Sequence, residues 1–342
     1  MSRRALTLLL AGVLSLALTL AAAVTRVPYV SLGPGPAYDT LGAVNGTSVI
    51  SVTGAKTYPT NGRLDLTTVG VQDGITLFDA VRGWLSPREE VVPREVLFPP
   101  EQTAKQVDQM NVQEMKQSQD AATAAALRQL GLPTTTVVAV ESVAPGAPAT
   151  GKLTPGDILT TVDGSPVDSA RRLRQLVGAH KPGDQVTVGY SRRDRPATAT
   201  ITTTSSSTKP PRSILGVGVQ EQSSSPIKVT ISLRDVGGPS AGLMFALGII
   251  DKLGPDSLTG GRNIAGTGEI RPDGTVGQIG GIAEKLLGAR AVGATVFLVP
   301  ADNCADAKAN RPSGLELVKV ATLKQALAAL QVLGNGGTPA PC

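Results

Sequence analysis

The chain has 342 residues and is 41% hydrophobic but only 3% aromatic, so its cores must be built mainly from aliphatic side chains and alanine. This length allows two or three small domains. The net charge of +5 is mild, and the basic residues form no dense face with interleaved aromatics, so we expect no nucleic-acid partner. The one histidine, His180, and the two cysteines, Cys304 and Cys342, exclude a histidine-rich metal site, and we expect no metal.

The N-terminal segment predicts a membrane anchor. Ala5–Val24 is a run of 20 residues without charge or proline, and a helix of that length spans about 30 Å, the thickness of a hydrocarbon core. A cleaved signal peptide is the alternative, because Ala21–Ala23 offers small residues for cleavage, but cleavable signals have only about 7–15 apolar residues. We therefore expect residues 1–25 to form a cytoplasmic stub and a transmembrane helix in contact with the membrane through residues 5–24. The positive charges before the run place the N-terminus in the cytoplasm and the rest of this single-pass cell-membrane protein outside.

Residues 26–115 are predicted to form a small β-containing domain. Strands are expected at Ser48–Val52 and Leu64–Val71, and a short helix at Leu77–Leu85. The segment Gly33–Pro36 is interpreted as a turn. We find no catalytic groups in this domain.

A second unit is predicted over residues 116–203. A helix-like stretch, Asp108–Leu130, leads into a strand at Thr135–Val140, an amphipathic helix at Asp168–Ala179 and a strand at Val186–Tyr190. The turns and small residues between them have a characteristic order: Gly131, Pro148-Ala149, Leu153, Gly156-Asp157, Asp163-Gly164 and Pro182-Gly183-Asp184.

This order resembles a PDZ domain. PDZ domains bind extended peptides by adding a strand to an exposed sheet edge, so the resemblance implies protein or peptide partners. The groove would lie between Thr135–Val140 and the helix Asp168–Ala179. His180, just past that helix, is expected to be a surface histidine. The arginine clusters in this unit are interpreted as solvated surface charge: Arg171, Arg172, Arg174, Arg192, Arg193 and Arg195.

Two other stretches of this region have simpler interpretations. Gly146–Lys152 fits the first seven positions of a phosphate-binding loop, but Leu153 replaces the Ser or Thr that would hold magnesium, so we expect no nucleotide or other cofactor. Residues 204–212 are rich in Ser, Thr and Pro and are predicted to be a linker.

The next segment places a serine where a nucleophile could lie. Ile227–Leu233 alternates apolar and polar residues and predicts a half-buried strand, while Leu243–Lys252 predicts a buried helix. Ser240 falls in the first turn of that helix. Gly237 and Gly238 let the backbone turn sharply, and the unpaired N–H groups at the helix start, including that of Ala241, can stabilise an oxyanion. On this turn alone, a helix-capping serine is the favoured interpretation.

A lysine further along the chain is unusual. Ile282, Leu286 and Ala289 form one apolar stripe of a predicted helix, and Lys285 lies at its margin. Such a lysine can reach water with its ammonium while its stem is buried. Alternatively, burial lowers its pKa and lets it act as a general base.

Four ordered motifs decide between these interpretations: Gly238-Pro-Ser-Ala-Gly242, Gly266-Thr-Gly-Glu-Ile270, Gly274-x-Val276 and Ile279-Gly-Gly-Ile-x-x-Lys285. They resemble the proteolytic domain of Lon proteases over residues 213–334, with Phe297–Pro300, Asn303 and Val320–Leu330 continuing the likeness. With the PDZ unit and the anchor, the chain resembles the PDZ-containing, membrane-anchored Lon-like proteases of bacteria.

The resemblance implies the roles of the site residues. Ser240 and Lys285 would form a catalytic dyad, and Thr267 would orient the lysine. Asp235 and Glu269 are expected to be structural neighbours. Full-length Lon carries an ATPase module that is not recognised here, so cleavage independent of ATP is implied, and the likeness to Lon suggests a ring-shaped homo-oligomer.

The sequence thus predicts an α+β multidomain protein: a transmembrane helix, a small β-containing domain, a PDZ domain, a Lon-type α/β proteolytic domain and a flexible tail at residues 335–342. Its predicted function is that of a serine endopeptidase that selects substrates with its PDZ domain. Two alternatives stay open: a peptide-binding module with an inert Lon-like scaffold, and a protease driven by a separate ATPase. The tail could let Cys342 reach Cys304 and form a disulfide.

Overall fold

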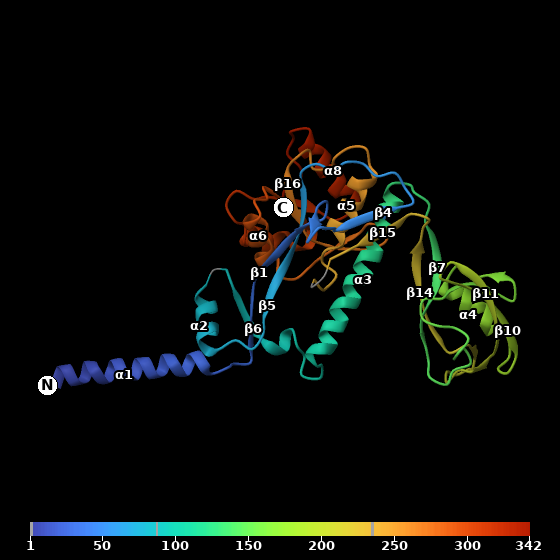
Figure 1. The fold of residues 1–342 in the computed structure, drawn as a ribbon, viewed down its shortest axis with the longest axis horizontal. Coiled ribbons are helices and arrows are strands. Elements are labelled where there is room, and N and C mark those ends of the chain that lie inside the picture. Colours follow the sequence, from blue (N-terminus) through green and yellow to red (C-terminus); the bar gives the residue numbers. More distant parts are fainter. Residues whose placement is uncertain (1–2, 87, 234–235) are drawn as a thin grey trace. The chain divides into compact units, whose positions relative to one another are not determined.

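The computed structural model describes residues 3–86, 88–233 and 236–342 (Figure 1). The chain divides into two compact units. The large unit contains Met1–Gly131 and Ile227–Cys342, and the inserted unit contains Leu132–Pro226.

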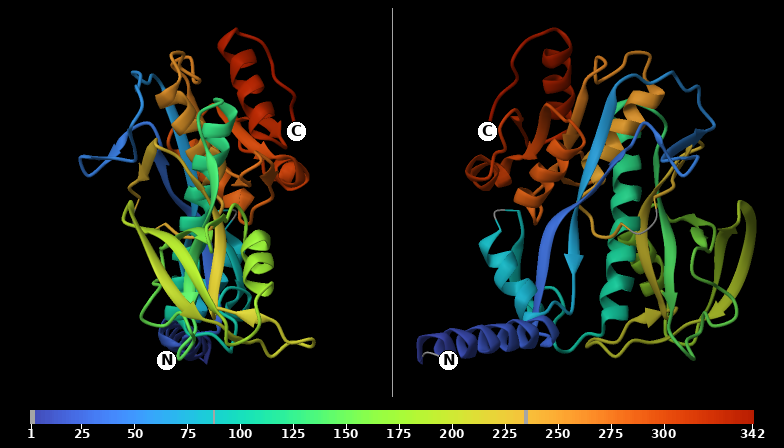
Figure 2. Two further views of the ribbon diagram at one scale, coloured as in Figure 1. Left: turned by 90° about the vertical axis from the view of Figure 1, so that its right-hand side faces the viewer. Right: turned by 60° about the vertical axis from the view of Figure 1, so that its left-hand side comes forward.

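The large unit is built on one six-stranded sheet with the strand order β20-β19-β16-β5-β1-β6. Strands β5, β16, β19 and β20 run parallel, whereas β1 pairs antiparallel with β5 and β6. Figures 1 and 2 show the blue N-terminal strands beside the orange and red C-terminal ones. The strands are β1 (Tyr29–Asp39), β5 (Arg63–Gln72), β6 (Glu90–Pro93), β16 (Asn263–Gly266), β19 (Val296–Pro300) and β20 (Glu316–Val320).

Helices cover both faces of this sheet. Along β19, Val296 and Leu298 belong to one hydrophobic core while Phe297 and Val299 belong to the other, as the period of two along a strand requires. The first core contains residues of α3 (Ala104–Gln129), α5 (Gly242–Leu253) and α8 (Leu323–Gly334), and the second contains residues of α6 (Ile282–Ala291) and α7 (Cys304–Ala309). The large unit is therefore a three-layer α/β structure.

The structure divides the N-terminal half differently from the prediction. The predicted strand Leu64–Val71 and helix Leu77–Leu85 correspond to β5 and α2 (Leu77–Leu85). However, β5 lies inside the sheet, where it pairs with β1 on one side and with Asn263–Gly266 on the other. Residues 26–115 therefore share one sheet with the Lon-like segment and form no separate body. An interior strand needs hydrogen-bond partners on both edges, and one of them lies about two hundred residues later in the chain.

Smaller elements complete this unit. The segment Gly33–Pro36, predicted as a turn, lies inside β1 at a register shift between Pro34 and Ala37, where the Thr68 hydroxyl donates to the Pro36 carbonyl at 2.7 Å. A second strand pair joins distant segments, β4 (Ile50–Thr53) and β15 (Lys228–Ile231). The remaining short elements are β2 (Ala43–Val44), β3 (Thr47–Ser48), β17 (Glu269–Ile270), β18 (Val276–Gly277) and 3-10 turns at Arg94–Val96 and Ala301–Asn303.

The N-terminal segment is helical, as α1 (Arg3–Val24). Among the residues that the structure describes, no helix is both long and apolar enough to cross a membrane. The predicted transmembrane anchor, its membrane contact through residues 5–24 and the single-pass localisation that rested on it are therefore wrong. The prediction counted uncharged residues, but Thr7, Ser15 and Thr19 interrupt the apolar run, and the Thr19 hydroxyl donates to the Ser15 carbonyl at 2.9 Å.

The inserted unit has its own sheet and core. Its strand order is β11-β10-β8-β7-β14, with the short β9 paired to β8, and α4 packs its buried Leu173 and Val177 into the core. The elements are β7 (Thr135–Val143), β8 (Ile158–Val162), β9 (Ser165–Pro166), α4 (Ala170–Gly178), β10 (Gln185–Arg192), β11 (Arg195–Thr202) and β14 (Val217–Ser224). This unit therefore extends past residue 203. The predicted linker, residues 204–212, contains strand β12 (Thr204–Ser205), which pairs with β13 (Ser213–Ile214), and the loop between these two strands. Strand β14 closes the sheet by pairing with β7.

The C-terminal tail is held against β20 rather than left loose. The Lys319 N–H donates to the Ala340 carbonyl at 3.1 Å, and the Cys342 N–H donates to the Leu317 carbonyl at 3.2 Å. A disulfide joins Cys304 to Cys342, which confirms the predicted pairing.

We expect the disulfide to stabilise the large unit. Its cysteines are 38 residues apart, and closing a loop of that length restricts the unfolded chain by about 4 kcal/mol in the loop-entropy model. Cys342→Ser should therefore lower the denaturant midpoint of the oxidised protein, and reduction of the wild type should lower it similarly. Thiol labelling of the unreduced native protein checks the premise, since a full signal from both cysteines would contradict it.

Candidate active site

Ser240 lies at the start of α5, in the turn that follows β15. The backbone reaches it through Gly238, whose φ of +82° is a left-handed conformation that glycine adopts without strain. The Ser240 carbonyl accepts the Gly268 N–H at 2.8 Å, and the Gly268 carbonyl accepts the Leu243 N–H at 3.0 Å. These bonds fix the serine beside the segment that follows β16.

Lys285 extends from the first turn of α6 toward this serine. The side chain is only 3% exposed. Its Nζ donates to Ser240 Oγ at 2.7 Å and to Thr267 Oγ1 at 3.1 Å. The helix begins at Gly281, whose φ is +67°, and a Cβ there would collide with Val69 of β5. Only glycine lets α6 begin this close to the sheet.

Thr267 completes the group at the end of β16. It is 1% exposed, and its hydroxyl donates to the Ser240 carbonyl at 3.0 Å while accepting from Lys285. The structure thus brings together the three side chains singled out from the sequence, from three different elements. Among the described residues, no three His, Cys, Asp or Glu side chains are grouped as a metal site.

Burial decides the electrostatics of the lysine. Removal from water lowers the pKa of Lys285 to about 8, against the opposing effect of the Glu269 and Glu284 carboxylates. Burial also raises the pKa of Glu284, the residue next to the lysine. Asp235 lies outside the described residues. His180 belongs to the inserted unit, where its Nε2 pairs with Asp163 at 3.0 Å.

The predicted oxyanion donors are not equivalent. The Gly238 N–H donates to the Asn111 carbonyl at 3.1 Å, so it is already engaged. A Cβ on Gly237 would lie 2.7 Å from the Asn111 Cβ, so this glycine serves close packing. The N–H groups of Ser240 and Ala241, at the start of α5, remain the better candidates because the first N–H groups of a helix have no intrahelical acceptor.

Helix α3 supports the serine turn, and the sequence analysis missed this role. The Ser118 hydroxyl is buried and donates to the Pro239 carbonyl at 2.8 Å. A Cβ on Gly242 would lie 2.9 Å from Ser118 Oγ, which explains the glycine. The helical spacing of the residues could have predicted that Ser118 is buried, because it lies in the same buried stripe as Met115, Ala122 and Ala125.

Asn303 supports the lysine helix in a similar way. Its buried side chain accepts the Ile279 N–H and donates to the Ile279 carbonyl, both at 2.9 Å. This two-point contact holds the Ile279–Gly281 segment from which α6 begins. Cys304, next in the chain, carries the disulfide to the tail.

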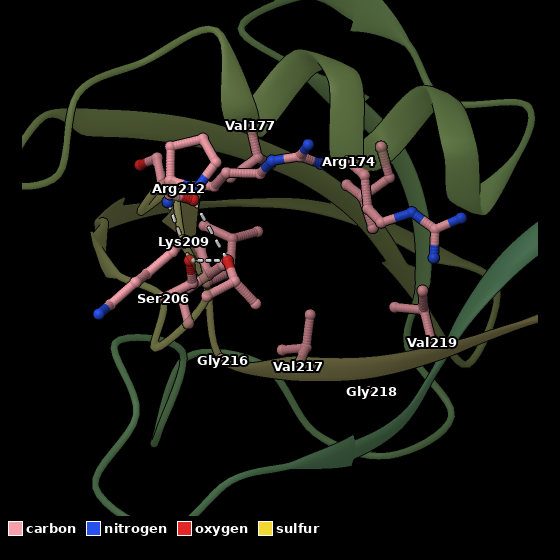
Figure 3. Close-up of a pocket in the computed structure, with 15 residues that line it drawn as sticks. Arg174, Val177, Ser206, Lys209, Arg212, Gly216, Val217, Gly218 and Val219 are labelled. Atoms are coloured by element: carbon pink, nitrogen blue, oxygen red, sulfur yellow. Dashed lines mark hydrogen bonds between the residues drawn. The ribbon is translucent and has the colours of Figure 1, made fainter.

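The groove of the inserted unit lies beside a different strand from the one predicted: it borders β14 instead of the neighbouring β7. A cavity of about 690 Å³ lies between α4 and β14, and the loop of residues 206–212 forms one of its walls (Figure 3). The predicted groove strand, β7, lies inside the sheet between β8 and β14, so its edges are occupied. The edge strand β14 comes from residues that the prediction assigned to the proteolytic domain.

Comparison with protein families matches residues 110–203 to the PDZ domain and residues 226–332 to the Lon protease (S16) C-terminal proteolytic domain. The chain is 46% identical over 94 residues to Lon protease 1 of Sorangium cellulosum, which is 27% of this chain and 11% of that protein. It is 46% identical over 69 residues to the Lon protease of Clostridioides difficile, which is 20% of this chain and 8% of that protein. Among solved structures, the PDZ domain of an SdrC-like protein from Listeria monocytogenes is 29% identical, with 24% of this chain and 85% of that chain covered and a TM-score of 0.23.

These matches define what the chain is similar to: one segment matches the PDZ domain and the other matches the proteolytic domain of Lon proteases. In its domain content the chain resembles a PDZ-containing Lon-like protease. The matched segments span only about a tenth of the length of these Lon relatives.

We predict that Ser118 positions the Ser240 turn. Ser118→Ala removes the bond to Pro239, and a turn displaced by a fraction of an ångström should lower kcat by about 10- to 100-fold with little change in KM. The loss of stability should be only about 1 kcal/mol. Thr123→Ala is the matched control, because that hydroxyl donates to the Gln119 carbonyl of its own helix and has no other partner among the described residues. Equal activity in the two variants would contradict the prediction.

Proposed function

We propose that the large unit is a serine peptidase in which Ser240 is the nucleophile and Lys285 is its general base. The observation that carries this proposal is the 2.7 Å contact between Lys285 Nζ and Ser240 Oγ in a buried site. A lysine held out of water with a pKa near 8 is neutral in a useful fraction of molecules at neutral pH. The match to a Lon-type proteolytic domain supports a peptide-bond hydrolase.

The chemistry proceeds in two stages. Neutral Lys285 takes the proton from Ser240 Oγ, and the oxygen attacks the scissile carbonyl to form a tetrahedral intermediate whose oxyanion is held by the N–H groups at the start of α5. Collapse expels the amine, which receives the proton from Lys285, and leaves an acyl-enzyme. Lys285 then activates water to release the second product. Thr267, bonded to both partners, orients the lysine.

We propose that this domain cleaves flexible or already exposed polypeptides independently of ATP, because acyl transfer to a serine and hydrolysis of the acyl-enzyme require only the substrate, the dyad and water. The inserted unit would select them, since the exposed edge of β14 can accept an extended segment as an added strand. A ring-shaped homo-oligomer, suggested by the likeness to Lon proteases, is a further proposal that sedimentation of the full chain tests.

Substitution of the dyad tests the proposed function. Ser240→Ala and Lys285→Ala should each lower cleavage of an unstructured protein by at least about 1,000-fold while the protein stays folded. Lys285→Arg should fail equally, because arginine stays protonated. His180→Ala is the control and should keep full activity. Substantial cleavage by Lys285→Arg, or loss of chemistry in folded His180→Ala, would show that another residue is the base.

The pH dependence gives an independent check. A base must be neutral to accept a proton, so kcat should rise about tenfold per pH unit below the lysine pKa and level off above it. With the pKa of Lys285 lowered to about 8 by burial, the midpoint should lie near that pH. Steady-state rates on a short peptide, measured between pH 6 and 10, test this. A midpoint near 6.5 would instead indicate a histidine.

A further inference from the structure

The disulfide lies one residue away from a contact that positions the lysine helix. Cys304 is the first residue of α7, and the preceding Asn303 accepts the Ile279 N–H and donates to the Ile279 carbonyl, both at 2.9 Å. Helix α6 begins soon after this contact, at Ile282, and carries Lys285 in its first turn. The C-terminal tail is thus connected to the lysine through one side-chain contact and one short segment of backbone.

The disulfide is also part of the packing around α6. Ile279, Cys304 and Cys342 are partly buried and pack against the same hydrophobic core, which contains Ile282 and Leu286 of this helix. Closely packed interiors transmit small displacements instead of absorbing them. The position of the last residue of the chain is therefore expected to affect the position of the helix that carries the lysine.

The tail has few other attachments to the large unit. Two backbone hydrogen bonds join it to β20, from the Lys319 N–H to the Ala340 carbonyl and from the Cys342 N–H to the Leu317 carbonyl, and Pro339 is buried. Fixing the backbone of residues 335–342 costs more free energy than two hydrogen bonds and one small buried side chain return. We therefore expect the tail to leave β20 when the covalent link is opened.

A reductant can open this link. Cys304 and Cys342 are each partly exposed, and they are the two cysteines of the chain, so no third thiol of the protein competes for either sulfur. A thiolate of a dithiol attacks one sulfur to form a mixed disulfide, which the second thiol of the reductant resolves. Two electrons and two protons pass to the protein, which leaves two cysteine thiols, and the dithiol becomes a disulfide.

We propose that the Cys304–Cys342 disulfide is a redox switch that acts on the dyad through Asn303. In the oxidised protein the tail and Asn303 together hold the start of α6, so that Lys285 meets Ser240. Reduction releases the tail, and the lysine loses its alignment with the serine. The disulfide and Asn303 are positioning groups, since neither touches the reacting atoms. This inference rests on the proposed function in that Lys285 is the base.

Steady-state kinetics of the full chain in its oxidised and reduced forms test the proposal. The substrate is a short fluorogenic peptide without cysteine, and the reductant is dithiothreitol. Reduction should lower kcat by about 5- to 20-fold with little change in KM, because a small displacement of the base slows the reaction without weakening substrate binding. Reoxidation should restore the rate. The double variant Cys304→Ser, Cys342→Ser should show the low rate with and without the reductant.

A second pair of variants tests the route through Asn303. Asn303→Ala should lower kcat in the oxidised protein, and reduction should then lower it by a smaller factor than in the wild type, because both changes act on one contact. Asn310→Ala is the matched control, because that side chain donates to the Asp306 carbonyl within α7, at 2.9 Å. It should keep the full response to reduction. An unchanged response in Asn303→Ala would overturn the proposed route.

Thermal melts of both forms separate a switch from a purely structural disulfide. Equal kcat in the oxidised and reduced proteins, both folded, would overturn the switch and leave the proposed peptidase intact. Unfolding of the reduced protein at the assay temperature would also overturn it, since the disulfide would then serve stability alone. A loss of rate on reduction of the double serine variant would assign the effect to the reductant. If the oxidised wild type cleaves no peptide, the proposed function fails and this inference fails with it.

Discussion

The structure of the large unit depends on keeping one lysine nitrogen out of water and beside one hydroxyl. Lys285 reaches Ser240 only because α6 begins close to β5, where Gly281 avoids a collision with Val69. A buried amine is costly unless it is hydrogen-bonded, and here Ser240 and Thr267 supply its partners. The same burial that makes a charged lysine unfavourable lowers its pKa, which is what the proposed role of a general base requires. Stability and chemistry are thus linked in one side chain.

The surrounding fold holds Ser240 and Lys285 through helices on opposite faces of the sheet. The core that contains α5 residues lies on one face and the core that contains α6 residues lies on the other, so their distance is set by the sheet itself. Each helix start has a second support. Ser118 of α3 bonds the turn before α5, and Asn303 bonds the segment before α6. Neither Ser118 nor Asn303 takes part in the proposed reaction, yet both help to fix where Ser240 and Lys285 lie.

Local patterns in the sequence were sufficient for some parts of this structure and not for others. The helix Leu77–Leu85 was predicted with the bounds it has, because a helical stripe depends on residues within a few turns. The stripe beside Lys285 left a buried lysine and a lysine reaching water both open, and the turn before Ser240 alone favoured a capping serine, so the roles of these two residues rested on the resemblance to Lon proteases. The sheet partners of β5 and the edge position of β14 could not be derived in this way. Both depend on pairings between segments far apart in the chain, and alternation along a strand reports which faces are buried, not which strand lies next to it.

The inserted unit interrupts the large unit between α3 and β15, the two elements on either side of the serine turn. The chain leaves the large unit at the end of α3 and returns to it just before β15, and these two elements flank the serine turn in different ways. Helix α3 bonds the turn directly, through the Asn111 carbonyl and the Ser118 hydroxyl, while β15 precedes it in the chain. Since α3 also packs in the core with α5, its position helps to determine where Ser240 lies relative to Lys285. The segment up to Gly131 is therefore part of the large unit, and a fragment restricted to the Lon-like segment would lack both the β5 pairing and the α3 support.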